Sequence, residues 1–258
     1  RSVAQYWGAN RLDRIGPAVW QGLYVSLIGG VVLLMFVPIA DTLFRIVGHS
    51  PLVMEYEIVY FRILSFGAAP AIASSVMSGF FSGRGETKPV MWVNVLAICV
   101  NIALDYLLIF GKAGFPEMGI AGAAIATVIA GTVNFAAYLA LAARNTYRRE
   151  YRTLSGWRPD LNLFGRLMRF GFPNGVQFTL DIMGFTFFIL LIGRKGTEYL
   201  AASNIALNIN SLAYLPMIGL GMAISILVGQ YLGGEDVKTA EKSVWSGCHT
   251  TIAYISVI

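Results

Sequence analysis

Charged side chains are scarce in this sequence. Aspartate, glutamate, lysine and arginine make up 13% of its 258 residues, which is about half the share typical of a soluble domain. Hydrophobic residues make up 56%, and the mean hydropathy is +0.65. Such a chain suits a lipid bilayer better than water, so its length is counted in membrane spans and not in soluble domains.

Residues that form disulfides or bind transition metals are also few. The two cysteines, Cys99 and Cys248, and the two histidines, His49 and His249, match neither a disulfide framework nor a metal pair in their spacing. No glycine-rich nucleotide loop precedes a helix, and no catalytic constellation is visible. We therefore expect no enzyme activity and no cofactor.

Long apolar runs are abundant instead. Seven of them can be read, separated by short polar joints, and each complete run is long enough to cross a bilayer, which takes about 20 residues. The pattern predicts an all-α, polytopic transmembrane protein. The first residue is Arg1 and the last is Ile258, inside an apolar stretch, so we expect a piece of a longer protein. The runs cover about 17–40, 56–80, 89–110, 118–143, 163–192 and 200–232, with a seventh from about 239 that is unfinished.

The basic residues test this topology, because successive joints must lie on opposite sides of the membrane. Fourteen fall on one side, four on the other, and Arg62 lies inside a span. The positive-inside rule then places the arginine-rich joint at 144–162 in the cytoplasm. A net charge of +5 distributed in this way argues against nucleic-acid binding. The fourteen are Arg1, Arg11, Arg14, Arg84, Lys88, Arg144, Arg148, Arg149, Arg152, Arg158, Arg166, Arg169, Lys238 and Lys242; the four are Arg45, Lys112, Arg194 and Lys195.

The sequence also contains an internal repeat. Residues 3–8, VAQYWG, align with residues 228–233, VGQYLG, and seven of twenty positions match over 3–22 and 228–247. Both copies precede an apolar run on the same side, which predicts a parallel repeat about an axis along the membrane normal. We therefore expect three parts: 1–143 from a first lobe with four spans, 144–162 as a cytoplasmic linker, and 163–258 from a second lobe.

Three polar residues share one face of the fifth span. Asn174, Gln177 and Asp181 follow an i, i+3, i+7 spacing, and Asp181 lies roughly 16 Å into the span at 1.5 Å per residue. A carboxylate at such depth costs a few kcal/mol and is rare unless it has a function. We expect this face to line a cavity, or else to hydrogen-bond to another helix.

A second carboxylate lies in the third span. Asn94, Asn101 and Asp105 share a face there, and Asn101 and Asp105 can offer oxygens to one cation. Oxygen ligands suit Na⁺ or a transferable proton and do not suit a transition metal. The alternative is a structural contact between helices. Thr127 and Asn134 form a similar face in the fourth span.

Further polar residues lie on one face of the sixth span: Asn204, Asn208 and Ser211, with Tyr214 a turn later. Each of them could equally be a small polar contact between helices. Arg62 is expected to pair with Glu55 or Glu57, or to reach the interface.

Several of these motifs resemble one known family, the multidrug and toxic compound extrusion (MATE) transporters. Residues 101–110, NIALDYLLIF, followed by 118–127, MGIAGAAIAT, look like that family's fifth-to-sixth helix signature. Residues 170–173, FGFP, with Asp181 resemble the start of its seventh helix. Residues 206–216 and 228–233 resemble its eighth helix and exit loop.

The resemblance implies a twelve-helix fold with two six-helix lobes, of which this chain would cover helices three to nine. It implies that Asn101, Asp105 and Thr127 match a cation site in the first lobe. It also implies that Asp181 matches the coupling carboxylate of the second lobe, which is Glu in many members, and that Tyr214 matches an aromatic residue near the cation. The acidic partners on helices one and ten would lie outside this chain.

The function that this resemblance implies is antiport across the cell inner membrane, by a monomer. Drugs or other amphipathic, often cationic, compounds would leave in exchange for Na⁺ or H⁺. The substrate cavity would be lined by Asn174, Gln177, Phe178, Asn204, Asn208 and Tyr214. The alternatives are a lipid-linked oligosaccharide flippase and a membrane scaffold. A flippase should have a strongly basic cavity, whereas Arg62 is the one basic residue expected to be buried deep within a span.

Overall fold

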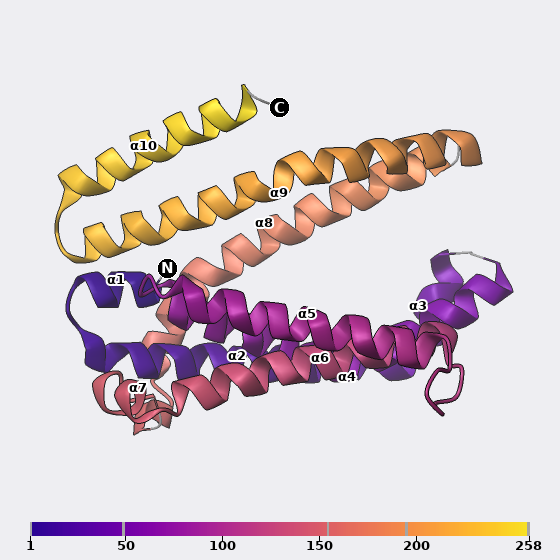
Figure 1. Cartoon of the computed structure of the whole chain (residues 1–258), viewed down its shortest axis with the longest axis horizontal. Helices are drawn as coiled ribbons and strands as arrows, with labels where there is room; N and C mark the ends of the chain where they lie inside the picture. The colour runs from indigo at the N-terminus through magenta and orange to yellow at the C-terminus, as the bar shows by residue number, and fades with distance from the viewer. Residues whose placement is uncertain (1, 48–49, 154, 194–195, 257–258) are drawn as a thin grey trace. The chain divides into compact units, whose positions relative to one another are not determined.

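The chain is described by a computed structural model that covers residues 2–47, 50–153, 155–193 and 196–256. Across these residues the regular elements are all helices (Figure 1). Arg1, His49, Arg194 and Lys195, which the sequence analysis named, lie outside the described residues. The elements are α1 (Ser2–Gly8), η1 (Leu12–Arg14), α2 (Ile15–Phe36), η2 (Val37–Ile39), α3 (Ala40–Val47), α4 (Pro51–Ser82), α5 (Thr87–Ile109), α6 (Gly119–Ala142), α7 (Asn145–Glu150), η3 (Ser155–Trp157), α8 (Leu161–Gly193), α9 (Thr197–Gly233) and α10 (Val237–Ile255).

Six of the predicted spans are long and apolar enough to cross a membrane. They lie in the segments Leu12–Ile46, Pro51–Ser82, Thr87–Ile109, Gly119–Ala142, Leu161–Gly193 and Ala201–Gly233. The seventh apolar run does form the helix α10, but it is not among these six in the part of the chain that the structure describes. Lys238, Glu241 and Lys242 occupy its first turns and lower its hydropathy.

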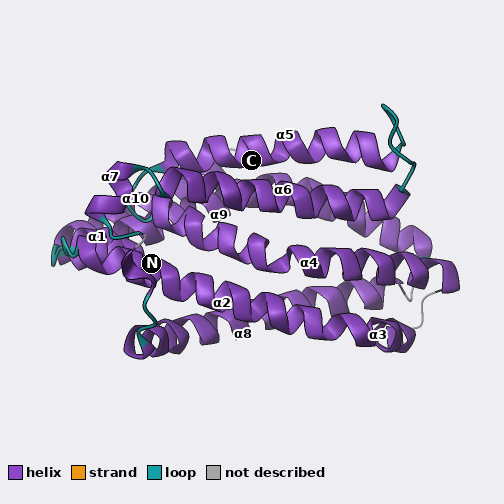
Figure 2. Cartoon of the chain, turned by 90° about the horizontal axis from the view of Figure 1, so that it is seen from below, coloured by secondary structure: helices purple, strands orange, loops and turns teal. Residues whose placement is uncertain are grey.

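Helix contacts divide the chain into two units. The first comprises Arg1–Asn10 with Asp160–Ile258, and the second comprises Arg11–Pro159. In the second unit α5, α6, α4 and α2 stack in that order, as Figure 2 shows. The prediction of two lobes in a longer protein stays a prediction.

Small residues set the spacing of this stack. A Cβ added to Gly30 of α2 would come 2.5 Å from the Cβ of Ala69 in α4, and one added to Gly67 of α4 would meet Val128 of α6 at 2.7 Å. Gly122 of α6 lies against the backbone of Leu108 in α5, at 2.7 Å. Membrane helices approach this closely where side chains are small, because apolar burial drives them together less than it does in water.

One end of the second unit is covered by the segment that follows α6. The backbone N–H of Gly16 donates to Tyr151 at 3.0 Å, and Trp20 Nε1 donates to the carbonyl of Thr153 at 2.6 Å. The Tyr24 hydroxyl donates to the carbonyl of Trp157. The joint before α2 and the arginine-rich joint therefore lie at the same end, as the charge pattern predicted.

Among the described charged residues of this covering layer, Arg84 is the most buried. It is 4% exposed, and its Nη2 lies 3.0 Å from Glu86 Oε2. The Tyr147 hydroxyl donates to the same carboxylate oxygen at 2.8 Å. Four rings surround the guanidinium carbon, at 4.0 Å (Phe80), 4.5 Å (Tyr151), 4.7 Å (Tyr147) and 5.3 Å (Phe81). We call these six residues the Arg84 cluster; it joins the α4–α5 turn to α7.

The structure differs from the expectations for the first joint at two points. Residues 41–47 were expected to form part of a polar joint, but they are helical in α3. Among the described residues Arg62 forms its ion pair with Asp41, with Nη2 and Oδ2 2.5 Å apart, and not with Glu55 or Glu57. Asp41 lies at the start of α3, a short helix that follows α2 and the turn η2, and its ion pair with Arg62 joins α3 to α4.

The first unit is much less packed. In α8 only Leu163 is buried among the described residues. The C-terminal part of α9 contacts α1 and α10, and the Tyr254 hydroxyl of α10 donates to the carbonyl of Ala213 at 3.3 Å. That bond lies beside Pro216, which lacks a backbone donor and leaves the helix there short of hydrogen bonds.

Candidate functional site

The two polar faces predicted in the third and fourth spans meet each other. Asn134 Nδ2 of α6 donates to Asn94 Oδ1 of α5 at 3.1 Å. The two helices form an antiparallel hairpin, so moving seven residues along each helix keeps the register. That step places Asn101 opposite Thr127. We call the face formed by Asn94, Asn101, Asp105, Thr127 and Asn134 the α5–α6 seam.

Asp105 lies one turn beyond Asn101 in this seam and is half-buried. Its Oδ1 is buried and has no hydrogen-bond partner among the described residues. The Thr127 hydroxyl donates to the carbonyl of Ala123 in its own helix at 2.9 Å, and a hydroxyl that donates still has lone pairs with which to accept. A carboxylate oxygen buried without a partner is costly, and a bound cation or a proton removes that cost.

The predicted face of α8 is laid out differently. Asn174, Gln177 and Asp181 are all exposed, and Asn174 Nδ2 donates to the carbonyl of Phe170 within the same helix at 2.8 Å. Phe178 is exposed as well. The structure gives Asp181 the predicted helix face but brings no second carboxylate to it among the described residues.

The predicted face of α9 is likewise open. Asn204, Asn208 and Tyr214 are exposed, and the Ser211 hydroxyl donates to the carbonyl of Leu207 in its own helix at 2.8 Å. Asn204, Asn208 and Tyr214 are not among the residues that line the cavity between α1 and α8. Their assignment to a substrate cavity therefore stays a prediction.

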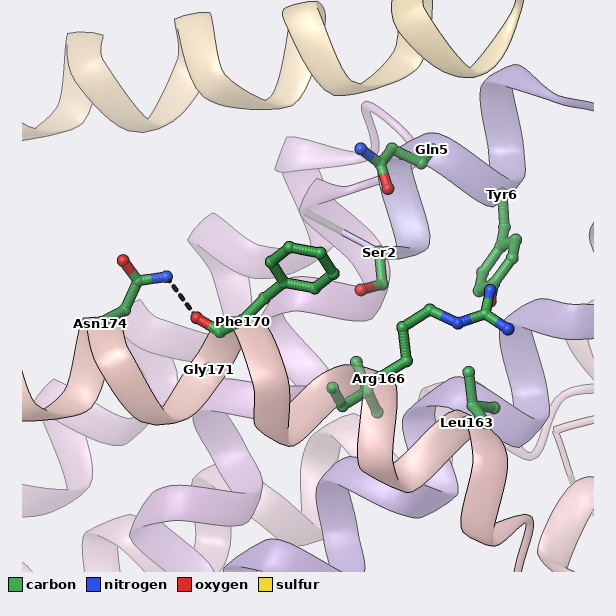
Figure 3. A pocket seen from close by; sticks show the side chains of 9 residues that line it. Ser2, Gln5, Tyr6, Leu163, Arg166, Phe170, Gly171 and Asn174 are labelled. Carbon is green, nitrogen blue, oxygen red and sulfur yellow. Dashed lines mark hydrogen bonds between the residues drawn. The ribbon is translucent and has the colours of Figure 1, made fainter.

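A cavity of about 260 Å³ lies between α1 and α8 (Figure 3). Asn174 is the one predicted cavity residue that lines it. Figure 3 shows Arg166 and Tyr6 at one side of the cavity, and Phe170, Gly171 and Asn174 at the other. The full lining is Ser2, Gln5, Tyr6, Leu163, Arg166, Leu167, Phe170, Gly171 and Asn174.

Sequence reasoning missed most of this lining. Gln5 and Tyr6 lie in the repeat, which was an available signal, but Arg166 was counted only as a joint charge. Pairing residues 2–6 with residues 163–174 requires knowing that α1 packs in the same unit as α8 and α9. Periodicity within one helix carries no such information.

Six apolar spans with polar groups at a helix seam define a polytopic membrane protein of the transporter class. The family model for MatE matches residues 2–107 and 173–258. The chain therefore belongs to the MatE family.

Named relatives and solved structures agree with this assignment. The chain is 32% identical over 257 residues to the "Probable multidrug resistance protein NorM" of Bradyrhizobium diazoefficiens, covering 99% of this chain and 55% of the relative. It is also 32% identical to the protein of the same name from Geobacillus kaustophilus, covering 97% of this chain and 56% of that one. A crystal structure of a MATE protein in the straight conformation superposes with a TM-score of 0.84 at 27% identity, covering 99% and 57%.

The chain thus spans a little over half the length of the curated relatives that it matches. What those whole proteins do is carried to this chain only as a proposal.

Proposed function

We propose that this chain is part of a secondary antiporter that exports drugs or other amphipathic, often cationic, organic compounds in exchange for Na⁺ or H⁺. Its family membership and the multidrug-resistance names of its relatives support the proposal. The observation that carries it is the buried, unpartnered Oδ1 of Asp105 in the α5–α6 seam.

The seam suits a small hard cation or a proton. Asp105 offers a carboxylate, Asn101 an amide oxygen one turn earlier, and Thr127 a hydroxyl oxygen opposite Asn101. Carboxylate, amide and hydroxyl oxygens are the ligands of hard cations, whereas copper and zinc prefer nitrogen or sulfur. Protonation of Asp105 would serve equally, because it also removes the unpaired negative charge.

Ion binding at this seam would drive transport by changing a conformational equilibrium. A ligand shifts such an equilibrium only by the difference in its affinity for the two states. The site fulfils this condition if the second state moves α5 relative to α6 or admits water to Asp105. Asp181 would be the coupling carboxylate of the second lobe, beside a substrate cavity lined by Asn174, Gln177, Phe178, Asn204, Asn208 and Tyr214.

The experiment measures the rate of drug efflux from cells or proteoliposomes that contain the transporter. The Na⁺ gradient and the pH gradient are imposed separately. Asp105→Asn and Asp181→Asn keep the side-chain volume and remove the charge. Each should abolish efflux driven by the coupling gradient without lowering the amount of protein in the membrane. Asp13→Asn, at an exposed carboxylate outside the seam, is the matched control and should export normally. Wild-type efflux by both Asp105→Asn and Asp181→Asn would refute the proposal.

The flippase alternative has little support in the structure. A lipid pyrophosphate needs several cationic side chains inside the cavity, whereas Arg166 is the one basic residue that lines the cavity between α1 and α8. The guanidinium of Arg62, the basic residue expected inside a span, is paired with Asp41 at 2.5 Å. The antiporter is the function that the site supports best.

A further inference from the structure

The two copies of the internal repeat end in the same backbone conformation. The N–H of Ala9 donates to the carbonyl of Gln5 at 2.9 Å, and the N–H of Gly234 donates to that of Gln230 at 3.0 Å. The next residues, Asn10 and Glu235, have φ values of 54° and 60°. Residues other than glycine adopt positive φ uncommonly. Finding it at equivalent positions shows that the likeness of the copies extends to their structure.

These two copies pack against each other. Helix α1 contacts the end of α9, and Figure 1 shows both running toward the same end of their unit. A Cβ on Gly8 would overlap the carbonyl oxygen of Gln230, and a Cβ on Gly233 would overlap the carbonyl oxygen of Gln5. A Cβ on Gly234 would lie 3.2 Å from the carbonyl oxygen of Gly8. The backbones of α1 and α9 therefore lie too close together for any residue larger than glycine at Gly8 or Gly233.

The contact is reciprocal in the manner of a two-fold interface. Gly8 and Gly233 are equivalent in the repeat, as are Gln5 and Gln230, and each glycine faces the glutamine carbonyl of the other copy. In an isologous contact, residue i of one copy meets j of the other and the reverse also holds. Ala4 and Gly229, a further equivalent pair, are both buried. We call the contact of 3–10 with 228–235 the glycine interlock.

We propose that the glycine interlock is a gate that closes the transporter at the end where α1 and α9 terminate. The inference rests on the proposed antiport, because alternating access requires each end to open and close. Helix α1 precedes the spans assigned to the first lobe, and α9 belongs to the second. In the closed state α1 lies in the same contact unit as α9, but through Asn10 it is joined to the spans assigned to the first lobe. In the opening that we propose, α1 moves with those spans and the interlock breaks; closure restores it.

Glycine is required at both positions for a steric reason. Each neighbour is a backbone carbonyl that already accepts a hydrogen bond within its own helix, so it cannot move aside as a flexible side chain would. A methyl group at Gly8 or Gly233 therefore holds the two copies apart. It favours the state that is open at this end, and by the two-fold relation the two substitutions act alike.

The test measures exposure and not transport. In the membrane-embedded protein with Cys99→Ala and Cys248→Ala, the reporter is Ala4→Cys, at a position that is 0% exposed. A membrane-impermeant maleimide is applied to inside-out and right-side-out vesicles. Adding Gly8→Ala or Gly233→Ala should raise the labelling rate of the reporter roughly tenfold, because an overpacked methyl group destabilises the closed contact by an amount of that order. The increase should occur with the maleimide on one side of the membrane only.

Matched variants make the result decisive. Gly79→Ala adds a methyl where nothing lies within 4 Å and should leave labelling unchanged. Combining Gly8→Ala with Gly233→Ala should give less than the product of the two single effects, because one methyl already parts the copies. Equal labelling in Gly79→Ala, Gly8→Ala and Gly233→Ala would overturn the proposal.

A second comparison needs no glycine variant, in case those proteins fail to fold. Ala4→Cys should label far more slowly than Gln5→Cys, which is exposed on the same helix; equal rates would also overturn the proposal. Labelling requires neither substrate nor an ion gradient. An Asp105→Asn protein that still exports would therefore count against the antiport site and leave the interlock standing.

Discussion

The glycines of the two units differ in what surrounds them. In the unit of residues 11–159, Gly30, Gly67 and Gly122 each lie against a neighbouring helix, within 2.5–2.7 Å of an added Cβ. In the other unit, the glycines along the middle of α8 and α9 have nothing within 4 Å of that position: Gly171, Gly175, Gly184, Gly219 and Gly221.

The difference shows that similar small residues serve two purposes. In α2–α6 they bring backbones together, and the α5–α6 seam runs along this contact, with Asp105 half-buried and Asn94 and Thr127 exposed. On α8 and α9 the same kind of residue accompanies exposed polar groups such as Asn174 and Asp181. Lipid would penalise such a face, so we infer that it faces a water-filled cavity or a further helix, as a transport pathway requires.

The largest expected effect is at the α5–α6 contact. Gly122→Ala places a methyl group against the backbone of Leu108 and should lower the unfolding free energy by about 1–3 kcal/mol. Gly131→Ala lies on the same helix in open space and is the control. Thermal unfolding in detergent measures both. Equal melting temperatures would show that the close approach of Gly122 to Leu108 does not contribute to the stability of this unit.

The sequence predicted the spans well, because charge and hydropathy change sharply at their ends. It also predicted which faces of α5 and α6 are polar, and Asn94 and Asn134 do meet. It did not predict that residues 41–47 after the first span are helical, or that Asp41 pairs with Arg62 from the next helix. Pairings between distant segments leave no trace in local periodicity.

The Arg84 cluster is an example of such a distant pairing, and it gives the second prediction. Methionine is unbranched and similar in length to arginine, so Arg84→Met keeps much of the packing. It removes the charge that lies between Glu86 and four aromatic rings. It should cost about 2 kcal/mol, since a desolvated cation over aromatic faces contributes that much. Arg148→Met, at an exposed position of α7, should change the melting temperature little.

Arg84→Lys separates charge from shape in the same cluster. Lysine keeps the charge but lacks the planar guanidinium that stacks on rings. Its melting temperature should therefore resemble that of Arg84→Met. Wild-type stability in Arg84→Lys would show that charge alone holds the cluster.

The open glycines of α8 should respond with the opposite sign. Gly171→Ala meets nothing within 4 Å and should raise stability by about 0.5–1 kcal/mol, because glycine loses more backbone entropy than alanine inside a helix. Unfolding of Gly171→Ala and Gly122→Ala under the same conditions tests the sign directly. Destabilisation by Gly171→Ala would mean that this face of α8 is covered in the assembled transporter.

The smallest effect concerns the pH response of the Arg84 cluster. Burial, and then the hydrogen bond to Glu86, raise the pKa of Tyr147 above its usual value, and burial also raises the pKa of Tyr151. A raised pKa means that the folded state favours neutral tyrosine. This stability is complete below the unfolded tyrosine pKa of about 10 and is lost as pH rises through the raised value.

Tyr147→Phe is the variant that tests this pH response. It removes the hydroxyl that donates to Glu86 but keeps the ring over Arg84. The variant should melt slightly below wild type at neutral pH. The difference should shrink as pH rises from about 10, the unfolded tyrosine pKa, through the raised pKa of Tyr147, where the wild-type hydroxyl ionises and loses the same bond. Melting curves at neutral and alkaline pH measure this. A constant difference would show that the hydroxyl contributes nothing through its proton, and that the cluster is held by its rings and the Arg84–Glu86 pair.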